Sequence, residues 1–346
     1  MSSQQIHLKK LDSLRGLASL YVVLHNLVYG LYGLNLISEG WKLFFFAGQE
    51  AVMLFFILSG FVIYLSTHQK NLDFRSFFVS RFRRIYFPFV LSILLSILIF
   101  YFNGNLADKF SWKELLGNLL LLQDFGRVKP GNWFSPFLGN LPLWSLSYEW
   151  WFYMLFYPLY KFLPKSKRLY IILAFSAASY LIYTAYPNHI CLVGSYLIIW
   201  WCGVELATCF CEGKFSFKQV QIITFSLSLM MFLSLLPILQ VEQIKFGVYP
   251  FLVFRHFSAA LLIIWVGFFW YQHNFYCFDR LLGIFANLAP ISYAIYIFHF
   301  PLLVQLNLTQ IFNNFYLEYF LKSCLLFSLA YITEIKLQPL INRWLK

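Results

Sequence analysis

The chain has 346 residues, of which 60% are hydrophobic and only 12% are charged, and its mean hydropathy is +0.67. A soluble domain of this length carries about twice that share of charged residues, so the composition excludes an ordinary soluble fold. The net charge of +12 does not indicate nucleic-acid binding, because the basic residues lie between long apolar runs, where they act as topology signals.

Ten apolar runs are each long enough to cross a bilayer, and they lack the period-two alternation of a barrel. The sequence therefore predicts an all-α polytopic membrane protein with one domain over residues 1–346. With the N-terminus inside, eighteen Lys and Arg residues lie in cytoplasmic segments and six in outer ones, which favours both termini cytoplasmic. The expected spans are approximately 13–33, 43–66, 86–103, 143–163, 169–186, 190–211, 219–239, 249–271, 282–306 and 316–337.

Two further regions complete the layout. Residues 112–124 are amphipathic but too short to cross, and we expect them at an interface. The loop 104–142 is the longest connection.

Charged groups inside spans are costly, at about 2.5–3.5 kcal/mol each, so they are candidates for function. These candidates are His25, Glu50, Glu149, Glu205, Arg255, His256, His299 and Lys322.

The first span opens with LDSLRGLASLYVVLHN, Leu11–Asn26. Arg15 lies at its cytoplasmic end and His25 about 15 Å deeper, on one polar stripe of the helix. Imidazole is the side chain best suited to move a proton near neutral pH. The alternative is a histidine that only binds a neighbouring helix.

The segment SRFRRIYFP, Ser80–Pro88, places Arg81 and Arg84 on one helical face. Guanidinium groups bind phosphates through two parallel hydrogen bonds. The alternative is a cluster of positive charge that only sets topology.

Two later segments carry polar groups toward the outer side. In LPLWSLSYEWWFYMLFYP, Glu149 lies inside the span and shares a face with Tyr153, while Trp144 is either a sugar platform or part of an aromatic belt. In ISYAIYIFHFP, His299 is either a ligand on the acceptor side or an interfacial polar residue. The six cysteines show no metal-binding spacing, so no metal is expected.

Taken together, these segments resemble the acyltransferase 3 family of membrane acyltransferases. The opening stretch resembles the first-span signature of the family, LFFILSGFVI its second-span motif, RFRR its R-x-x-R element, WSLSYEWWFY its W-S-L-S-x-E-x-x-F-Y element and SYAIYIFHFP its late motif. The five matches run in family order from residue 11 to 301. Trp150 departs from the pattern, since many members carry a second Glu there.

The resemblance implies transfer of an acyl group, commonly acetyl from acetyl-CoA, to a hydroxyl of a glycan such as O-antigen, capsule or exopolysaccharide, in a bacterial cytoplasmic membrane. A polar passage would lead from the cytoplasmic mouth to His25, which would act as general base or transient acyl carrier, and Glu149 would orient His25 or the acceptor from the outer side. The expected roles of the other residues are acyl-CoA binding for Arg15, Arg81 and Arg84, acceptor binding for His299, Trp144 and Tyr153, and structural support for Asp12, Ser59 and Gly60.

A flippase for a lipid-linked sugar and a structural scaffold are the alternatives, and the absence of a repeated half argues against a transporter.

Overall fold

The computed structural model describes residues 3–33, 36–213, 215–309, 311–312 and 314–344. Within these ranges the chain forms helices and no strand. Nine described segments are helical, long and apolar enough to cross a membrane, which confirms the all-α polytopic class. The long helices are α1 (Ser3–Gly33), α3 (Gly48–Lys70), α4 (Phe74–Phe102), α8 (Arg168–Ala185), α9 (His189–Cys211), α10 (Phe217–Leu235), α11 (Phe251–Gln272) and α14 (Phe315–Tyr331).

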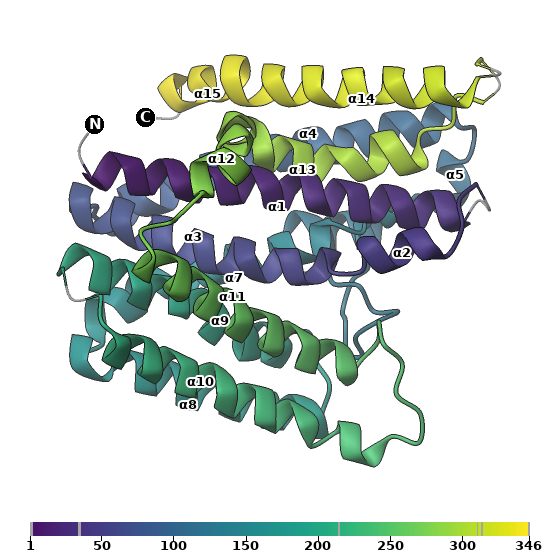
Figure 1. The fold of residues 1–346 in the computed structure, drawn as a ribbon. Coiled ribbons are helices and arrows are strands. Elements are labelled where there is room, and N and C mark those ends of the chain that lie inside the picture. The colour runs from purple at the N-terminus through teal and green to yellow at the C-terminus, as the bar shows by residue number, and fades with distance from the viewer. Residues whose placement is uncertain (1–2, 34–35, 214, 310, 313, 345–346) are drawn as a thin grey trace.

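The long helices run side by side along one axis (Figure 1). α14 forms one edge of the bundle and α8 with α10 the opposite edge, while α1, α3 and α9 lie between them. The beginning of α1 and the end of the last helix, α15 (Gln338–Trp344), lie at the same end of the bundle (Figure 1).

The fourth expected span, 143–163, is the helix α7 (Leu143–Phe162). It has 20 residues, the length of a span, but it is not among the nine segments that are apolar enough to cross a membrane. Its sequence mixes Trp, Tyr, Ser and one Glu with its aliphatic residues, which lowers its hydropathy. This composition suits a helix that is covered by protein, and ten of its residues are buried.

The helix α4 begins at Phe74, twelve residues before the expected start at residue 86. Asp73 caps it, since its side chain accepts a hydrogen bond from the amide of Ser76. The helix continues through Pro88, so the RFRR segment is part of one long helix and not of the preceding loop.

The last two spans are interrupted. The first contains α12 (Phe278–Leu282), the 3-10 segment η4 (Gly283–Ile291), α13 (Ser292–His299) and the π-helical turn η5 (Phe300–Gln305). Pro290 and Pro301 lie at these changes, because proline removes an amide donor and clashes with the preceding turn. The second contains α14, the π-helical turn η6 (Ile332–Leu337) and α15.

Short helices surround the long loop. They are α2 (Gly40–Phe44), α5 (Leu106–Lys109), α6 (Trp112–Leu119) and η1 (Phe137–Gly139). α6 covers the start of the predicted amphipathic stretch, and Ser111 caps it. Trp112, Leu116 and Leu120 are exposed there, as expected of a segment that faces an interface.

Glycines allow α3 and α9 to pack closely. A Cβ at Gly60 would lie 2.1 Å from the carbonyl oxygen of Trp200, and a Cβ at Gly203 would lie 2.0 Å from that of Ile57. Neither helix could approach the other so closely with a larger residue at these positions. The geometry agrees with the expected packing role of Gly60.

Candidate active site

Four arginines line one cavity of about 500 Å³, which we call the arginine cavity. Arg15 comes from α1, while Arg81, Arg83 and Arg84 come from α4. The three arginines that the sequence singled out therefore lie around one hollow. Four guanidinium groups around one cavity favour the binding of an anion.

The arginines of this cavity differ in the carboxylates and hydroxyl groups that lie close to them. Arg84 forms a close ion pair with the buried carboxylate of Glu334 and lies over the ring of Tyr293 at 5.5 Å. Arg15 is 4.0 Å from Asp12, a long contact between partly exposed side chains. Arg81 Nη2 donates to Ser80 Oγ at 3.2 Å, and its Nε is buried without a hydrogen-bond partner in the structure. Arg83 donates to the carbonyl oxygens of Val79 and Asn342. Among the described residues, Arg81 and Arg83 have no carboxylate within 4.0 Å and Arg15 has only a distant one.

The carboxylate of Glu149 also lines the arginine cavity. Its Oε1 accepts hydrogen bonds from Ser59 Oγ at 2.8 Å and from the hydroxyl of Tyr153, and these two hydroxyls are 3.0 Å apart. Ser59 is therefore a polar partner of Glu149, in addition to any packing role. The three side chains fix one another on the wall formed by α3 and α7.

The structure corrects the expected positions of Glu149 and Tyr153. Both were expected on the outer side, with Glu149 orienting His25, but both line the arginine cavity. The reason is that α7 begins inside the protein, where the buried residues Pro142 and Trp144 line the cavity that holds His25. Glu149 then lies about 9 Å further along the helix axis, at the level of the arginines.

His25 lines a second cavity, of about 610 Å³, which we call the histidine cavity. Its Nδ1 forms a short hydrogen bond to the carbonyl oxygen of Phe45. A carbonyl only accepts, so Nδ1 carries the proton and Nε2 is the basic nitrogen of the neutral ring. The ring of Tyr29 lies 4.5 Å from the imidazole, measured between centroids. The carbonyl of Phe45, and not Glu149, orients the imidazole.

Polar and aromatic side chains share the wall of the histidine cavity. The polar residues are Asn26, Gln49 and Arg255. Trp144 is one of several aromatic residues in the wall, so its expected place beside the acceptor is compatible with the geometry. Stacking surfaces next to hydrogen-bonding groups are what a sugar ring requires.

His299 supports the histidine cavity from behind. It is fully buried and lies outside the wall of both cavities. Its Nδ1 lies 3.2 Å from the carbonyl of Ile295 and its Nε2 lies 3.1 Å from Asn26 Nδ2. Nδ1 therefore donates to the carbonyl, and Nε2 accepts from the amide. His299 thus lies behind the wall and contacts Asn26, which does line the histidine cavity, while its acceptor-side role stays a prediction.

An ion pair of Arg255 with Glu50 borders the histidine cavity. The two side chains are only 11% and 13% exposed. The guanidinium lies 3.7 Å over the ring of Phe246 and donates to its carbonyl oxygen at 2.9 Å. Sequence reasoning noted both residues as charges inside spans but assigned them no role. Their positions on different spans gave no indication that they pair.

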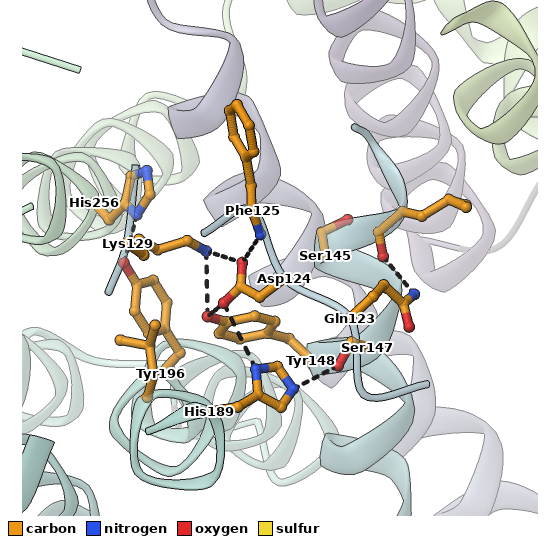
Figure 2. Close-up of polar contacts among 12 residues, drawn as sticks. Gln123, Asp124, Phe125, Lys129, Ser145, Ser147, Tyr148, His189, Tyr196 and His256 are labelled. Atoms are coloured by element: carbon orange, nitrogen blue, oxygen red, sulfur yellow. Dashed lines mark hydrogen bonds and ion pairs between the residues drawn. The ribbon is translucent and has the colours of Figure 1, made fainter. Parts of the chain in front are cut away.

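A second buried ion pair holds the long loop in place (Figure 2). Lys129 Nζ lies 2.7 Å from Asp124 Oδ1, and both side chains are 1% exposed. Tyr148 donates to Asp124 Oδ2, and His189 Nδ1 lies 3.7 Å from the same oxygen. Lys129 also lies 3.8 Å over the ring of Trp144, so the network supports a wall of the histidine cavity.

Electrostatics keep this buried pair charged. Burial alone would raise the pKa of Asp124, but the Lys129 ammonium and His189 outweigh burial and lower that pKa. Burial lowers the pKa of Lys129, and Asp124 opposes this shift. Sequence reasoning missed the pair because both residues lie in a Gly- and Pro-rich loop that it interpreted as a simple connection.

Two side chains lie where the cavities adjoin. Val52 of α3 and Tyr296 of α13 line both the arginine cavity and the histidine cavity. The hydroxyl of Tyr296 lies 2.7 Å from Ser145 Oγ and 3.1 Å from the carbonyl oxygen of Pro142. The two cavities therefore adjoin each other at Val52 and Tyr296.

One comparison with known proteins identifies a family. The profile of the acyltransferase domain family, acyltransferase 3, matches residues 8–335, nearly the whole chain. Searches among curated proteins and among solved structures find no match. The matched range contains both cavities except for Gln338 and Asn342, which line the arginine cavity beyond residue 335. The chain therefore belongs to the acyltransferase 3 family, and its activity is acyl transfer.

Proposed function

We propose that the protein transfers an acyl group, most readily acetyl, from cytoplasmic acyl-CoA to a hydroxyl of an envelope or extracellular glycan, such as O-antigen, capsule or exopolysaccharide. The membrane in question is the cytoplasmic membrane of a bacterium. One observation carries the proposal: an arginine-lined cavity adjoins a cavity that holds a positioned imidazole, and the two walls share Val52 and Tyr296. An anionic donor and a hydroxyl acceptor can thus meet at this boundary.

The arginine cavity fits the donor. The phosphates of CoA are anionic, and Arg81 and Arg15 have guanidinium groups that no carboxylate binds closely. Arg84 forms an ion pair with Glu334, so its guanidinium group is not free to bind a phosphate through two parallel hydrogen bonds. With the phosphates at this mouth, the pantetheine arm extends toward the boundary with the histidine cavity.

The imidazole of His25 supplies the chemistry. With Nδ1 donating to Phe45, Nε2 removes the proton of the acceptor hydroxyl as its oxygen attacks the thioester carbonyl carbon. The C–S bond breaks, and the thiolate of CoA takes the proton from the imidazolium. A general base of this kind contributes about 10²–10⁴-fold to the rate. Nε2 is also the nitrogen that would carry the acyl group if transfer passes through the imidazole.

The histidine cavity fits the acceptor. Trp144 offers a stacking face, and Asn26 and Gln49 offer amides to sugar hydroxyls. The side chain of His299 fixes Asn26, and Lys129 fixes Trp144 from the far side of the ring. These supports leave few rotamers for the residues that would bind the sugar, which favours catalysis by positioning.

The test uses the full-length protein in lipid nanodiscs with acetyl-CoA labelled in the acetyl group and glycan extracted from the envelope. We expect label in the polysaccharide and release of one free thiol for each acetyl group transferred. A protein that binds the glycan, or moves it across a vesicle membrane, but never transfers label would overturn the proposal and support a flippase. Comparison of the glycan from deletion and parent strains by mass spectrometry and NMR then identifies the acyl group and its position.

A further inference from the structure

We propose that Tyr296 and Val52 form a partition that sets the length of the acyl group and keeps water in the histidine cavity away from the thioester. This inference rests on the proposed function. It concerns residues for which the reaction itself requires no chemical role, because neither side chain is a base or a nucleophile in the transfer.

The positions of the two side chains carry the inference. Val52 follows Gly48 by one turn of α3, so it lies on the same face as the glycine that contacts the ring of His25. Tyr296 precedes His299 by one turn of α13. Both side chains are buried, at 3% and 7% exposure, although each borders two cavities. Both side chains therefore lie at the boundary of the two cavities.

Hydrogen bonds hold Tyr296 in this position. Its hydroxyl bonds to Ser145 and to the carbonyl of Pro142, which are both at the beginning of α7. The ring of Phe55 packs edge-on against it at 5.7 Å between centroids. The phenol thus bridges α13 to α7, and it stands where an acyl chain would have to pass.

The chemistry explains why a partition matters. In the unwanted reaction a water oxygen attacks the thioester carbonyl carbon, the C–S bond breaks, and the thiolate takes a proton that the water releases, which yields a carboxylic acid and free CoA. A filled boundary admits a small acyl group and excludes both water and longer chains. In a filled apolar site, one methylene more or less in the substrate changes kcat/KM by about 10–200-fold.

The experiment measures acyl-CoA hydrolysis without acceptor and transfer with acceptor, for acetyl-, butyryl- and hexanoyl-CoA, in nanodiscs. The variants are Tyr296→Ala and Tyr296→Phe. The control is Phe298→Ala, because Phe298 lies on the same helix, is 2% exposed and borders neither cavity. Val52→Ala opens the partition from the other side with a smaller loss of packing, so it serves as the second variant if Tyr296→Ala does not fold.

We expect Tyr296→Ala and Val52→Ala to raise the ratio of hydrolysis to transfer by about tenfold or more and to accept butyryl-CoA, with little change in acetyl-CoA affinity. Tyr296→Phe keeps the ring and should show a smaller rise, while Phe298→Ala keeps the wild-type ratio. An unchanged ratio and chain-length profile in both opening variants, in a protein whose wild type transfers acetyl, would overturn the partition alone. A wild type that neither binds acyl-CoA nor transfers label would overturn the proposed function and this inference with it.

Discussion

The ring of His25 lies so close to Gly48 that a Cβ at position 48 would be 2.2 Å from Cγ of the imidazole. Gly48 is the first residue of α3, so the absence of a side chain there allows the helix to begin directly against the ring. The carbonyl of Phe45, three residues earlier, holds Nδ1 from the same segment. The start of α3 thus sets both the position and the tautomer of the proposed base.

This contact predicts a selective loss of catalysis in Gly48→Ala. The added methyl group must displace the ring, which misaligns Nε2 while the arginine cavity is unchanged, so kcat for transfer should fall at least about a hundredfold. Acyl-CoA affinity should stay near the wild-type value in a direct binding assay. Gly267→Ala is the matched control, since a Cβ there meets nothing within 4 Å. Wild-type kcat in Gly48→Ala would contradict the proposed role of the ring.

The proposed role of Arg81 predicts that a variant with the same charge binds acetyl-CoA more weakly. In Arg81→Lys the positive charge remains but the two parallel donors are lost, so we expect the Kd for acetyl-CoA to rise about tenfold. Arg75→Lys is the control, because Arg75 is exposed and lies outside the arginine cavity. An equal change in both variants would show that only general positive charge matters, as in a topology cluster.

The pair of Asp124 and Lys129 predicts a stability effect that a double variant reverses. Asp124→Asn leaves the Lys129 ammonium buried without its anion, which should destabilise the protein by about 3–5 kcal/mol. Asp124→Asn combined with Lys129→Met removes both charges and should recover most of the loss in thermal unfolding. If the single and double variants unfold at the same temperature, the pair does not hold the loop.

The same pair predicts how stability depends on pH. The pKa of Asp124 is lowered in the folded protein, so its contribution to stability is fully present above the unfolded value of about 3.9 and is lost as the pH falls below it. Unfolding temperature measured between pH 7 and pH 3 should fall more steeply for the wild type than for the double variant. Parallel curves for the two proteins would contradict this origin of the acid sensitivity.

The close contact at Gly60 predicts that Gly60→Ala lowers the stability of the protein through the packing of α3 against α9. Gly60→Ala places a methyl group 2.1 Å from the carbonyl oxygen of Trp200, so α3 and α9 must separate. Overpacking of this kind costs about 1–3 kcal/mol. Thermal unfolding should show this loss relative to Gly267→Ala, and a variant as stable as that control would contradict the close crossing.

The sequence predicted most of the helices because long apolar runs have few alternatives in a bilayer. Helical spacing also predicted that Arg81 and Arg84 share one face, and the resemblance implied that Arg15 acts with them. It failed for Glu149 because hydropathy does not reveal that α7 begins inside the protein, beside the histidine cavity. Pairs such as Arg255 with Glu50 depend on contacts between distant spans, which periodicity does not contain.

The position of Tyr296 between the two cavities could also not be predicted from the sequence. The residue belongs to a recognisable motif, but its place between two cavities follows from how the short α13 packs against α7. The same applies to His299, whose burial behind Asn26 depends on the packing of α13 against α1. In both cases the residue was found by its motif and its position was found only from the fold.

The most direct test of the account is the effect of His25→Ala on transfer and on donor binding, measured on the same nanodisc preparation. The account predicts that transfer of labelled acetyl to the glycan is lost while acetyl-CoA still binds with near wild-type affinity, and that His273→Ala, at an exposed position after α11, behaves as the wild type. Transfer at the wild-type rate in His25→Ala would contradict the account.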